Sequence, residues 1–471
     1  MRVDLVNGAY VGRSIIANDQ RCVNLFLEVS PGDSPFPTVH YPTPGLIRLT
    51  TAPTTGWRGL YTVSSTGDLY GVCGNSVYYI APDWTLTLLG TLATSTGPVS
   101  MADNAYTVLI VDGTAAGYQI DIPTKALSVV HDPNFYGANR LGCVDTYFIA
   151  NRPGTQNYYI SLTNQATWDA LDVAAKTGSP DKLVTLEVMH NEIWLLGQVS
   201  SEVHYNSGAA DFTFARMPGV FINHGCMAAQ SVATYDQSIY WLSQSPEGQA
   251  IIMRGNNYTA ERISTHAIEA EMGKYARMDD AIGHCYQVGG HTFYQLTFPT
   301  ADATWVFDES TKLFHQRASI DADGTFHRHR ASCITAAYGQ IVCGDYNDGR
   351  LYAMSLNAYD EDGSPVVYLR TFPHMINDGR RCTYQRFVAD MEVGDAAAGD
   401  DPQVSLRWSD DRGASFGDAV MMPLGKTGEY LTSLQWWGLG MARDRVFELS
   451  WSAAVKTALN GAFVDILPHA S

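Results

Sequence analysis

Two histidines at strand spacing are the nearest approach to a metal-ligand pattern in this sequence. His327 and His329 stand two residues apart in the segment FHRHR at 326–330. Side chains two residues apart project from the same face of a strand, so the pair could chelate a metal ion through two ring nitrogens. Because no third ligand is adjacent, we interpret them as solvated or interface histidines and predict no metal site.

A second short pattern carries oxygen ligands. The segment DYNDG at 345–349 resembles a calcium-binding loop, but the Glu that would bind the ion through both carboxylate oxygens is missing from its expected place. Asn, Asp and Gly are also the residues that favour tight turns. We therefore predict a hairpin turn here.

The most specific local pattern reads SDDRGASF at 409–416. It resembles the Asp-box hairpin of sialidases, which ties its own turn together and lies away from the catalytic centre. In such a hairpin Asp411 would accept backbone N–H groups, Gly413 would adopt the permissive dihedral angles and Phe416 would anchor the next strand. We predict a structural Asp-box-like hairpin formed by Ser409, Asp411, Gly413, Ser415 and Phe416.

Catalytic signatures are missing from the sequence. A glycosidase needs two carboxylates that face each other across a cleft, and 48 acidic residues give no basis for choosing a pair. HExxH, GxxxxGK[ST] and GxGxxG do not occur. We predict a protein that is not an enzyme, with no catalytic residues, no cofactor and no metal.

The charge is strongly acidic. Lys and Arg number 30 against 48 Asp and Glu, which gives a formal charge of −18 and disfavours binding to the phosphates of a nucleic acid. Basic residues nevertheless gather near the C-terminus. They could hold an acidic surface of a neighbouring subunit or form scattered surface salt bridges, and they are Arg370, Arg380, Arg381, Arg386, Arg443 and Arg445.

The cysteines and the hydropathy pattern indicate the compartment. Eight cysteines are widely spaced without a CxxC pair, so we expect reduced thiols in the core and no zinc site. Asp4 and the turn residues Asn7 and Gly8 interrupt the place where a signal peptide needs an apolar stretch, and no apolar run approaches about 18 residues. We expect assembly in the cytoplasm and no membrane insertion.

Short apolar runs recur from about residue 57. Seven β-branched or aromatic runs return at a spacing close to that of propeller blades, about 40–50 residues: 69–72, 107–111, 147–150, 193–196, 239–242, 292–296 and 340–343. Second runs follow many of them after a polar turn: 77–80, 118–120, 158–160, 305–307 and 351–354. Evenly spaced hairpins without helices between them predict an all-β protein with a β-propeller of six or seven blades.

The predicted domains follow from changes in this rhythm. Residues 1–56 are rich in turn formers and are predicted to be an N-terminal arm with the first strands, and 57–362 the propeller. After the acidic turn at 360–365 the pattern alternates, which predicts a C-terminal β-sandwich domain at 363–471. Two β-sandwiches are the alternative to the propeller. Short helices are expected at 264–275 and 168–175.

The order of several segments resembles the packaged-DNA stabilisation, or tail-hub (nozzle), proteins of short-tailed phages. The segments that carry the likeness are CVNLF at 22–26, PGL at 44–46, RGLY at 58–61, LYGVCGNSVY at 69–78, VSMA at 99–102, QIVCGD at 340–345 and GLGMARDRVFEL at 438–449. Each segment is short, and the resemblance rests on the order in which the segments occur.

The resemblance implies a structural protein of the virion tail, assembled in the host cytoplasm. By this resemblance, the protein would form a homo-hexameric head-tail connector ring below the portal and the tail adaptor ring. It would retain packaged DNA until genome ejection and attach tail fibre, spike or needle proteins. Double-stranded DNA would pass through the channel without specific binding. The competing hypotheses are a propeller glycosidase or lyase and a carbohydrate-binding tail protein without catalysis.

Overall fold

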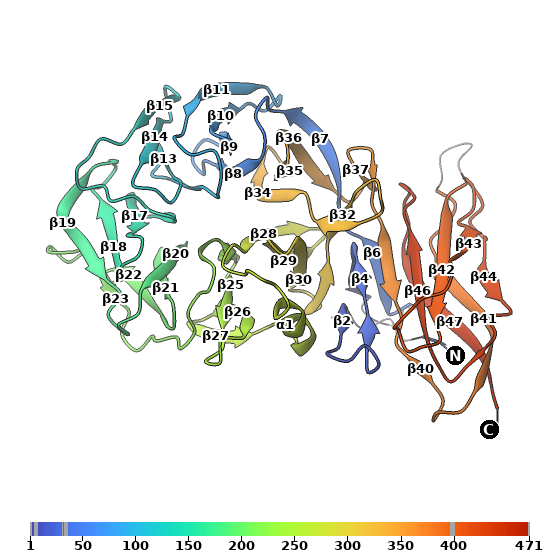
Figure 1. Cartoon of the computed structure of the whole chain (residues 1–471). Helices are drawn as coiled ribbons and strands as arrows, with labels where there is room; N and C mark the ends of the chain where they lie inside the picture. Colours follow the sequence, from blue (N-terminus) through green and yellow to red (C-terminus); the bar gives the residue numbers. More distant parts are fainter. Residues whose placement is uncertain (1, 4–7, 31, 33–35, 396–400, 470–471) are drawn as a thin grey trace.

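The computed structural model describes residues 2–3, 8–30, 32, 36–395 and 401–469. Nearly all regular structure is β-strand, and one short α-helix, α1 (His266–Met272), and one 3-10 turn, η1 (Ala229–Ser231), complete the described elements. Figure 1 shows a ring of small sheets with a second unit beside it, on the right of the view. No helix in these ranges is long and apolar enough to span a membrane.

Seven four-stranded antiparallel blades form the ring. The first blade consists of β8 (Trp57–Thr62), β9 (Leu69–Cys73), β10 (Ser76–Ile80) and β11 (Leu86–Thr91). The second consists of β12 (Ser100–Asp103), β13 (Thr107–Val111), β14 (Gly117–Asp121) and β15 (Ala126–Val129). The third consists of β16 (Leu141–Val144), β17 (Tyr147–Asn151), β18 (Asn157–Ser161) and β19 (Trp168–Ala175). The fourth blade consists of β20 (Leu183–Met189), β21 (Glu192–Gly197), β22 (Ser201–Asn206) and β23 (Phe214–Arg216). The fifth consists of β24 (Ala233–Tyr235), β25 (Ser238–Gln244), β26 (Ala250–Asn256) and β27 (Thr259–Arg262). The sixth consists of β28 (Ile282–Val288), β29 (His291–Phe298), β30 (Ala303–Asp308) and β31 (Leu313–Gln316).

The seventh blade is completed from the other end of the sequence. Its first three strands are β34 (Ala331–Ala337), β35 (Gln340–Asp345) and β36 (Arg350–Ser355), and its fourth is β7 (Gly45–Thr51). Because β7 immediately precedes the first blade, its pairing with β36 closes the ring with backbone hydrogen bonds. Closure leaves few free strand edges.

The second unit is a sandwich of two sheets. One contains β44 (Leu434–Trp437), β41 (Cys382–Met391), β47 (Leu459–Pro468), β6 (Thr38–Pro42) and β5 (Leu25–Val29), with β1 (Arg2–Val3) and β45 (Met441–Ala442) at its sides. The other contains β4 (Cys22–Val23), β39 (Tyr368–Thr371), β46 (Asp444–Trp451), β42 (Gln403–Ser409) and β43 (Val420–Pro423), with β40 (Met375–Ile376) beside β46. The predicted segment 1–56 thus supplies strands to both units.

The remaining described strands are short hairpins and extensions. They are β2 (Tyr10–Val11) with β3 (Asp19–Gln20), β32 (Ala318–Ile320) with β33 (Phe326–Arg328), and β37 (Asp360–Glu361) with β38 (Ser364–Pro365). β37 and β38 widen the seventh blade, and β4 joins the outer strand of the sixth blade to the sandwich through β39. The sixth blade and one sandwich sheet therefore form one continuous sheet.

The predicted fold class is confirmed, and the blade number is seven. The seven recurring runs are the second strands of the blades, and the five following runs are third strands. The predicted helix at 264–275 is confirmed by α1, but the helix predicted at 168–175 is wrong, because this segment is the outer strand β19. β19 pairs antiparallel with β18, so hydrogen bonding at the blade edge overrides the local helical preference of its Ala and Leu residues.

Hydrophobic cores fill the spaces between neighbouring blades. Six clusters each join two adjacent blades, for example the one around Val72, Val108 and Ile110 between the first and second. The seventh, between the fifth and sixth blades, continues into the sandwich, where it includes Phe387 and Phe447. One apolar core therefore spans both units.

Candidate functional site

A cavity lies along the propeller axis. The innermost strands of all seven blades line it, and its volume is about 880 Å³. Cavities of about 300–1,000 Å³ are typical of small-molecule sites. The cavity along the axis therefore has the size of a small-molecule site.

The charged groups in this cavity are largely bound to one another or to the backbone. Arg140 donates to the Glu187 carboxylate, with Nε 3.1 Å from Oε2, and to the Val232 carbonyl at 2.9 Å. Arg58 donates to four backbone carbonyl groups, including those of Thr94 and Gly97 at 2.8 and 2.6 Å. These contacts tie together successive blades around the axis.

His284 lines this cavity between the carbonyl group of Ser332 and the charge of Arg140. Nε2 of His284 donates to the Ser332 carbonyl at 3.0 Å, and burial, with a smaller contribution from the Arg140 charge, lowers the pKa of His284 to about 4. Glu187 is engaged by Arg140. A glycosidase needs a carboxylate free to transfer a proton or attack the sugar, and Glu187 is not placed for that role.

The predicted Asp-box-like hairpin connects β42 to β43. Asp411 Oδ1 accepts the Ser409 hydroxyl at 2.6 Å and the Ser415 backbone N–H at 2.9 Å, while Gly413 N–H donates to Ser409 Oγ at 2.8 Å. Hydrogen bonds from the Ser409 and Ser415 hydroxyl groups, followed by that of the Ser415 backbone, lower the pKa of Asp411 to about 2. The carboxylate thus accepts three hydrogen bonds from its own turn. In the sequence it follows the residues that line the propeller cavity, which end at Tyr346.

Two residues of this hairpin make contacts outside the turn. Gly413 has φ of 90°, and a Cβ added there would lie 2.8 Å from an Asp19 carboxylate oxygen, so the position requires glycine for both conformation and space. Phe416 lies beneath the guanidinium group of Arg407, 4.9 Å from ring centroid to Cζ, and precedes β43 by four residues. The hairpin therefore packs against the N-terminal segment.

The two histidines of the FHRHR segment lie in different environments. His327 is partly exposed, with Nδ1 2.6 Å from Asp302 and Nε2 3.1 Å from Asp321, so its two nitrogens point at separate carboxylates. His329 is 1% exposed, with Nε2 3.6 Å from Oε1 of the buried Glu361, so the interpretation as a solvated or interface histidine is wrong for this residue. Within the described ranges no group of three or more His, Cys, Asp or Glu side chains could hold a metal ion.

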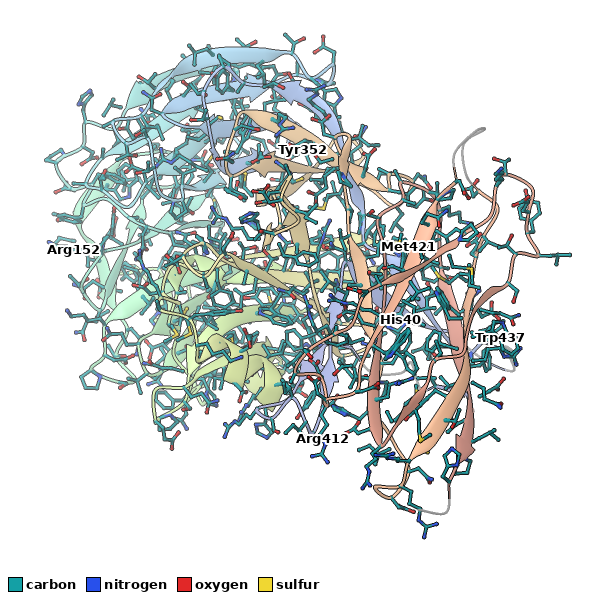
Figure 2. The ribbon with its side chains drawn as sticks, turned by 45° about the vertical axis from the view of Figure 1, so that its right-hand side comes forward. His40, Arg152, Tyr352, Arg412, Met421 and Trp437 are labelled. Atoms are coloured by element: carbon teal, nitrogen blue, oxygen red, sulfur yellow. The ribbon has the colours of Figure 1, made fainter. Side chains whose placement is uncertain are left out.

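The DYNDG segment is a turn, as predicted. It connects the antiparallel strands β35 and β36, and Asp345 Oδ1 accepts the Asn347 backbone N–H at 2.8 Å. The other Asp345 oxygen accepts the Tyr352 hydroxyl at 2.9 Å. Its carboxylate therefore holds the turn of the seventh blade, where Tyr352 is labelled in Figure 2.

The C-terminal arginines divide into internal and exposed groups. Arg370 and Arg445 are 0% and 1% exposed, and Arg386 pairs with Asp465 at 2.7 Å. Arg445 donates through Nε and Nη2 to both oxygens of Asp410, at 2.6 and 2.8 Å. An intersubunit role is therefore excluded for Arg370 and Arg445 by burial.

Asn24 connects the propeller with the sandwich. Its side chain is 2% exposed, and Nδ2 donates to the carbonyl groups of Ala318 and Val367 at 2.8 and 2.9 Å, while Oδ1 accepts the Ala318 N–H at 2.9 Å. Its backbone has φ of 56°, a left-handed conformation that Asn tolerates better than most residues. One side chain thus links the connection after the sixth blade to the entry of β39.

Buried cations surround this junction. Arg317, 2% exposed, donates to the Pro44 carbonyl at 2.6 Å, and Arg370 donates to the Gly8 carbonyl and to Gln20 at 3.1 and 3.0 Å. His40 is fully buried where the two units meet, as Figure 2 shows; burial, then the nearby charges of Arg370 and His315, hold its pKa well below its usual range. This cluster could not be predicted from the sequence, since isolated charges along the chain do not reveal burial.

The described fold is an all-β propeller joined to a β-sandwich through one apolar core. Two family models match the chain: one described as bacteriophage P22 Gp10, beta-propeller, over residues 1–359, and one described as bacteriophage P22 Gp10, beta-sandwich, over residues 368–467. The chain belongs to the bacteriophage P22 Gp10 family and is a structural protein of a phage tail. No curated protein matches it.

Three solved structures are similar to this chain at low sequence identity. PorZ, a surface component of the type-IX secretion system of Porphyromonas gingivalis, is 10% identical over 67% of this chain and 38% of its own, with a TM-score of 0.41. BamB from Moraxella catarrhalis is 8% identical over 71% and 97% of the two chains, with a TM-score of 0.39. The N-terminal domain of Nup159 is 9% identical over 71% and 98%, with a TM-score of 0.41. The chain therefore spans about two fifths of PorZ.

The segments that resemble the tail-hub family have structural roles. Asn24 of CVNLF bridges the two units, the Pro44 carbonyl of PGL accepts Arg317, and Arg58 of RGLY ties the first blade to the loop at 94–97. A Cβ at Gly45 would lie 2.4 Å from the Ala358 carbonyl oxygen, which explains glycine at this position. These residues fix the positions of the segments that they join.

Proposed function

We propose that this tail protein is the hexameric hub, or nozzle, of a short-tailed phage. In this role it extends the channel of the portal and adaptor rings, retains the packaged DNA and presents attachment sites for tail fibres, spikes or a needle. The observation that carries the proposal is the family assignment, which covers 1–359 and 368–467 in the order propeller then sandwich. The common core of the two units supports it, because a load-transmitting ring needs rigid subunits.

The DNA route in this proposal runs between subunits. The propeller cavity, about 880 Å³, has the size of a small-molecule site and contains side chains from every blade, so a duplex does not pass along the propeller axis. The chain carries a formal charge of −18, and a neutral or acidic channel wall would repel the phosphates and centre the duplex. Retention then depends on a plug or constriction rather than attraction.

Charge distribution tests this route directly. We expect the inner surface of the ring to be net negative and the exposed arginines Arg380, Arg381 and Arg443 to lie away from it. Cryo-electron microscopy of intact tails would locate the duplex and the wall. A wall lined by Lys and Arg, or a duplex threaded through individual propellers, would contradict the proposed route.

Symmetry is tested by counting copies. A connector follows the symmetry of the ring to which it binds, so tails should contain six copies of this chain. Native mass spectrometry of purified tails, with the adaptor ring present and absent, provides the count. A copy number that is not six would overturn the hub proposal, whereas cleavage of host polysaccharide by the purified protein would favour the glycosidase alternative.

A further inference from the structure

One end of the sandwich carries exposed arginines that have no acidic partner. Arg380, Arg381 and Arg443 are exposed, and within the described part of the chain none of them forms a salt bridge. They lie together, because Arg443 Nη1 is 3.5 Å from the Gly379 carbonyl and the His469 N–H donates to the Arg381 carbonyl at 3.0 Å. A cluster of unpaired cations stands out on a chain of charge −18.

Large apolar side chains adjoin these arginines. Met441 and Leu467 are 50% and 49% exposed, and both pair with Thr383, the second residue of β41, from the strands on its two sides. Trp437, 64% exposed, stands farther along the same sheet opposite Arg386 and lies on the side of the sandwich away from the propeller, as Figure 2 shows. We call the set Arg380, Arg381, Trp437, Met441, Arg443 and Leu467 the sandwich tip. Arg, Trp and Met are enriched at protein interfaces.

The opposite end of the molecule has a complementary edge. β19, the outer strand of the third blade, lies at the far left of Figure 1, whereas β41 and β44 lie at the far right. Leu171 on β19 is 85% exposed, the highest value for a large hydrophobic residue in the described strands. Asp169 and Asp172 flank it, and burial, followed by the charge of Asp169, raises the pKa of Asp172. A basic partner would relieve this repulsion.

We propose that the sandwich tip of one copy docks on β19 of the next copy, so that Arg380, Arg381 and Arg443 face Asp169 and Asp172 around an apolar centre. The inference rests on the proposed hexamer and names its contact. Two different surfaces at opposite ends make a heterologous contact, and such contacts generate rings when the rotation between copies closes. Attraction between exposed charges also makes the contact sensitive to salt.

Charge reversal tests the contact. The variant R380E/R381E should require at least a tenfold higher protein concentration to form rings, and adding D169R/D172R to the same chain should restore ring formation. The control variant K274E/K426E has the same change in net charge, at exposed sites away from the tip and β19, and should assemble like the unaltered chain. Native mass spectrometry of the protein and of purified tails gives the copy number, and thermal unfolding verifies that each variant folds.

Each outcome separates the contact from the hexamer. If the unaltered chain forms no six-fold ring in tails, the proposed function fails. If the unaltered chain and R380E/R381E form rings at the same concentration, the hexamer stands and this contact is wrong. If rings of R380E/R381E no longer retain duplex DNA, the arginines bind nucleic acid and not a neighbouring subunit. If adding D169R/D172R does not restore ring formation, β19 is not the strand on which the sandwich tip docks.

Discussion

The blades and the junction between the two units are held by different kinds of interaction. Between blades the contacts are apolar, as around Val72 and Val108, and the strands of a blade are neighbours in sequence. At the junction an apolar core also spans both units, and buried polar groups such as Asn24 and Arg317 are added to it, with partners about 270–340 residues away in the sequence. The repeat is thus stabilised by burial of nonpolar surface, and the relative placement of the units is specified by hydrogen bonds.

The difference has an energetic consequence. Apolar blade contacts tolerate conservative changes of volume, whereas a buried polar group whose partner is removed loses its compensation for desolvation. Single substitutions at the junction should therefore destabilise the protein more than comparable substitutions elsewhere. The predictions below test this contrast in order of decreasing effect.

Replacing Asn24 should have the largest effect. Asn24→Ala removes three buried hydrogen bonds, at about 1–3 kcal/mol for each backbone group left without a partner, and should lower the free energy of unfolding by about 3–6 kcal/mol. Asn164→Ala is the matched control, because Asn164 also has positive φ, 60°, but is exposed. Urea unfolding measures both. Equal losses for the two variants would show that the Asn24 side chain does not hold the junction.

Replacing the internal arginine of the sandwich should have the next largest effect. Arg445→Ala removes both bonds to Asp410 and the bond to the Leu439 carbonyl, and we expect a loss of about 2–4 kcal/mol. The loss stays below that of a fully buried pair because Asp410 is 46% exposed. Arg443→Ala, two residues away and exposed, should change stability by less than about 0.5 kcal/mol. Similar values for the two variants would contradict the division into internal and exposed arginines.

Acid should weaken the blades and the junction together. Burial lowers the pKa of His284, in the propeller cavity, to about 4 and that of His315, near the junction, to about 3. Below pH 6.5 the unfolded chain takes up protons that the folded histidines do not, so stability falls as the pH drops from 6.5 toward 4, by up to about 1.4 kcal/mol per pH unit for each histidine.

Two variants distinguish a cooperative molecule from two separate units. His284→Gln and His315→Gln should each reduce the pH dependence of the single unfolding transition by a similar amount, because one core joins the units. Thermal unfolding between pH 7 and 4.5 measures it. Both histidines lie in the sixth blade, so a second transition that neither variant changes would show that the sandwich unfolds independently of the propeller.

The Asp-box-like hairpin should contribute least. Asp411→Ala should lower the unfolding midpoint slightly, because the carboxylate is exposed and its bonds are local. The depressed pKa, about 2, means that the stabilisation by Asp411 is present above about pH 4 and is lost as the pH falls toward 2. Asp418→Ala, an exposed acid in the same loop, is the control and should show no such dependence. Loss of an enzymatic activity in Asp411→Ala without loss of stability would contradict a structural role.

The sequence predicted the blades because their middle strands are buried on both faces. Runs such as 107–111 and 239–242 are apolar for this reason, and they recur once per blade. The outer strands gave weaker signals: β19 has burial that varies along its length, and its Ala and Leu residues favoured a helix. The closure of the ring by β7 could not be predicted, since pairing with β36 is a long-range contact that leaves no periodic pattern.

The junction and the exposed tip were beyond local patterns for a different reason. Arg370 and Arg381 are chemically identical in the sequence, yet one is fully buried and the other exposed. Only the tertiary fold decides which arginine receives internal acceptors. The resemblance to the tail-hub family marked Asn24 within a signature, and its left-handed backbone and three side-chain bonds explain why asparagine is required there.

The copy number of this chain in assembled tails tests whether the protein is a hexameric hub. Native mass spectrometry of purified tails, supported by cryo-electron microscopy without imposed symmetry, gives the number and arrangement of subunits. We expect six copies in a ring, joined head to tail, with the propellers outside the DNA channel. A single copy, an open chain of subunits, or a duplex running through the propeller axis would contradict it.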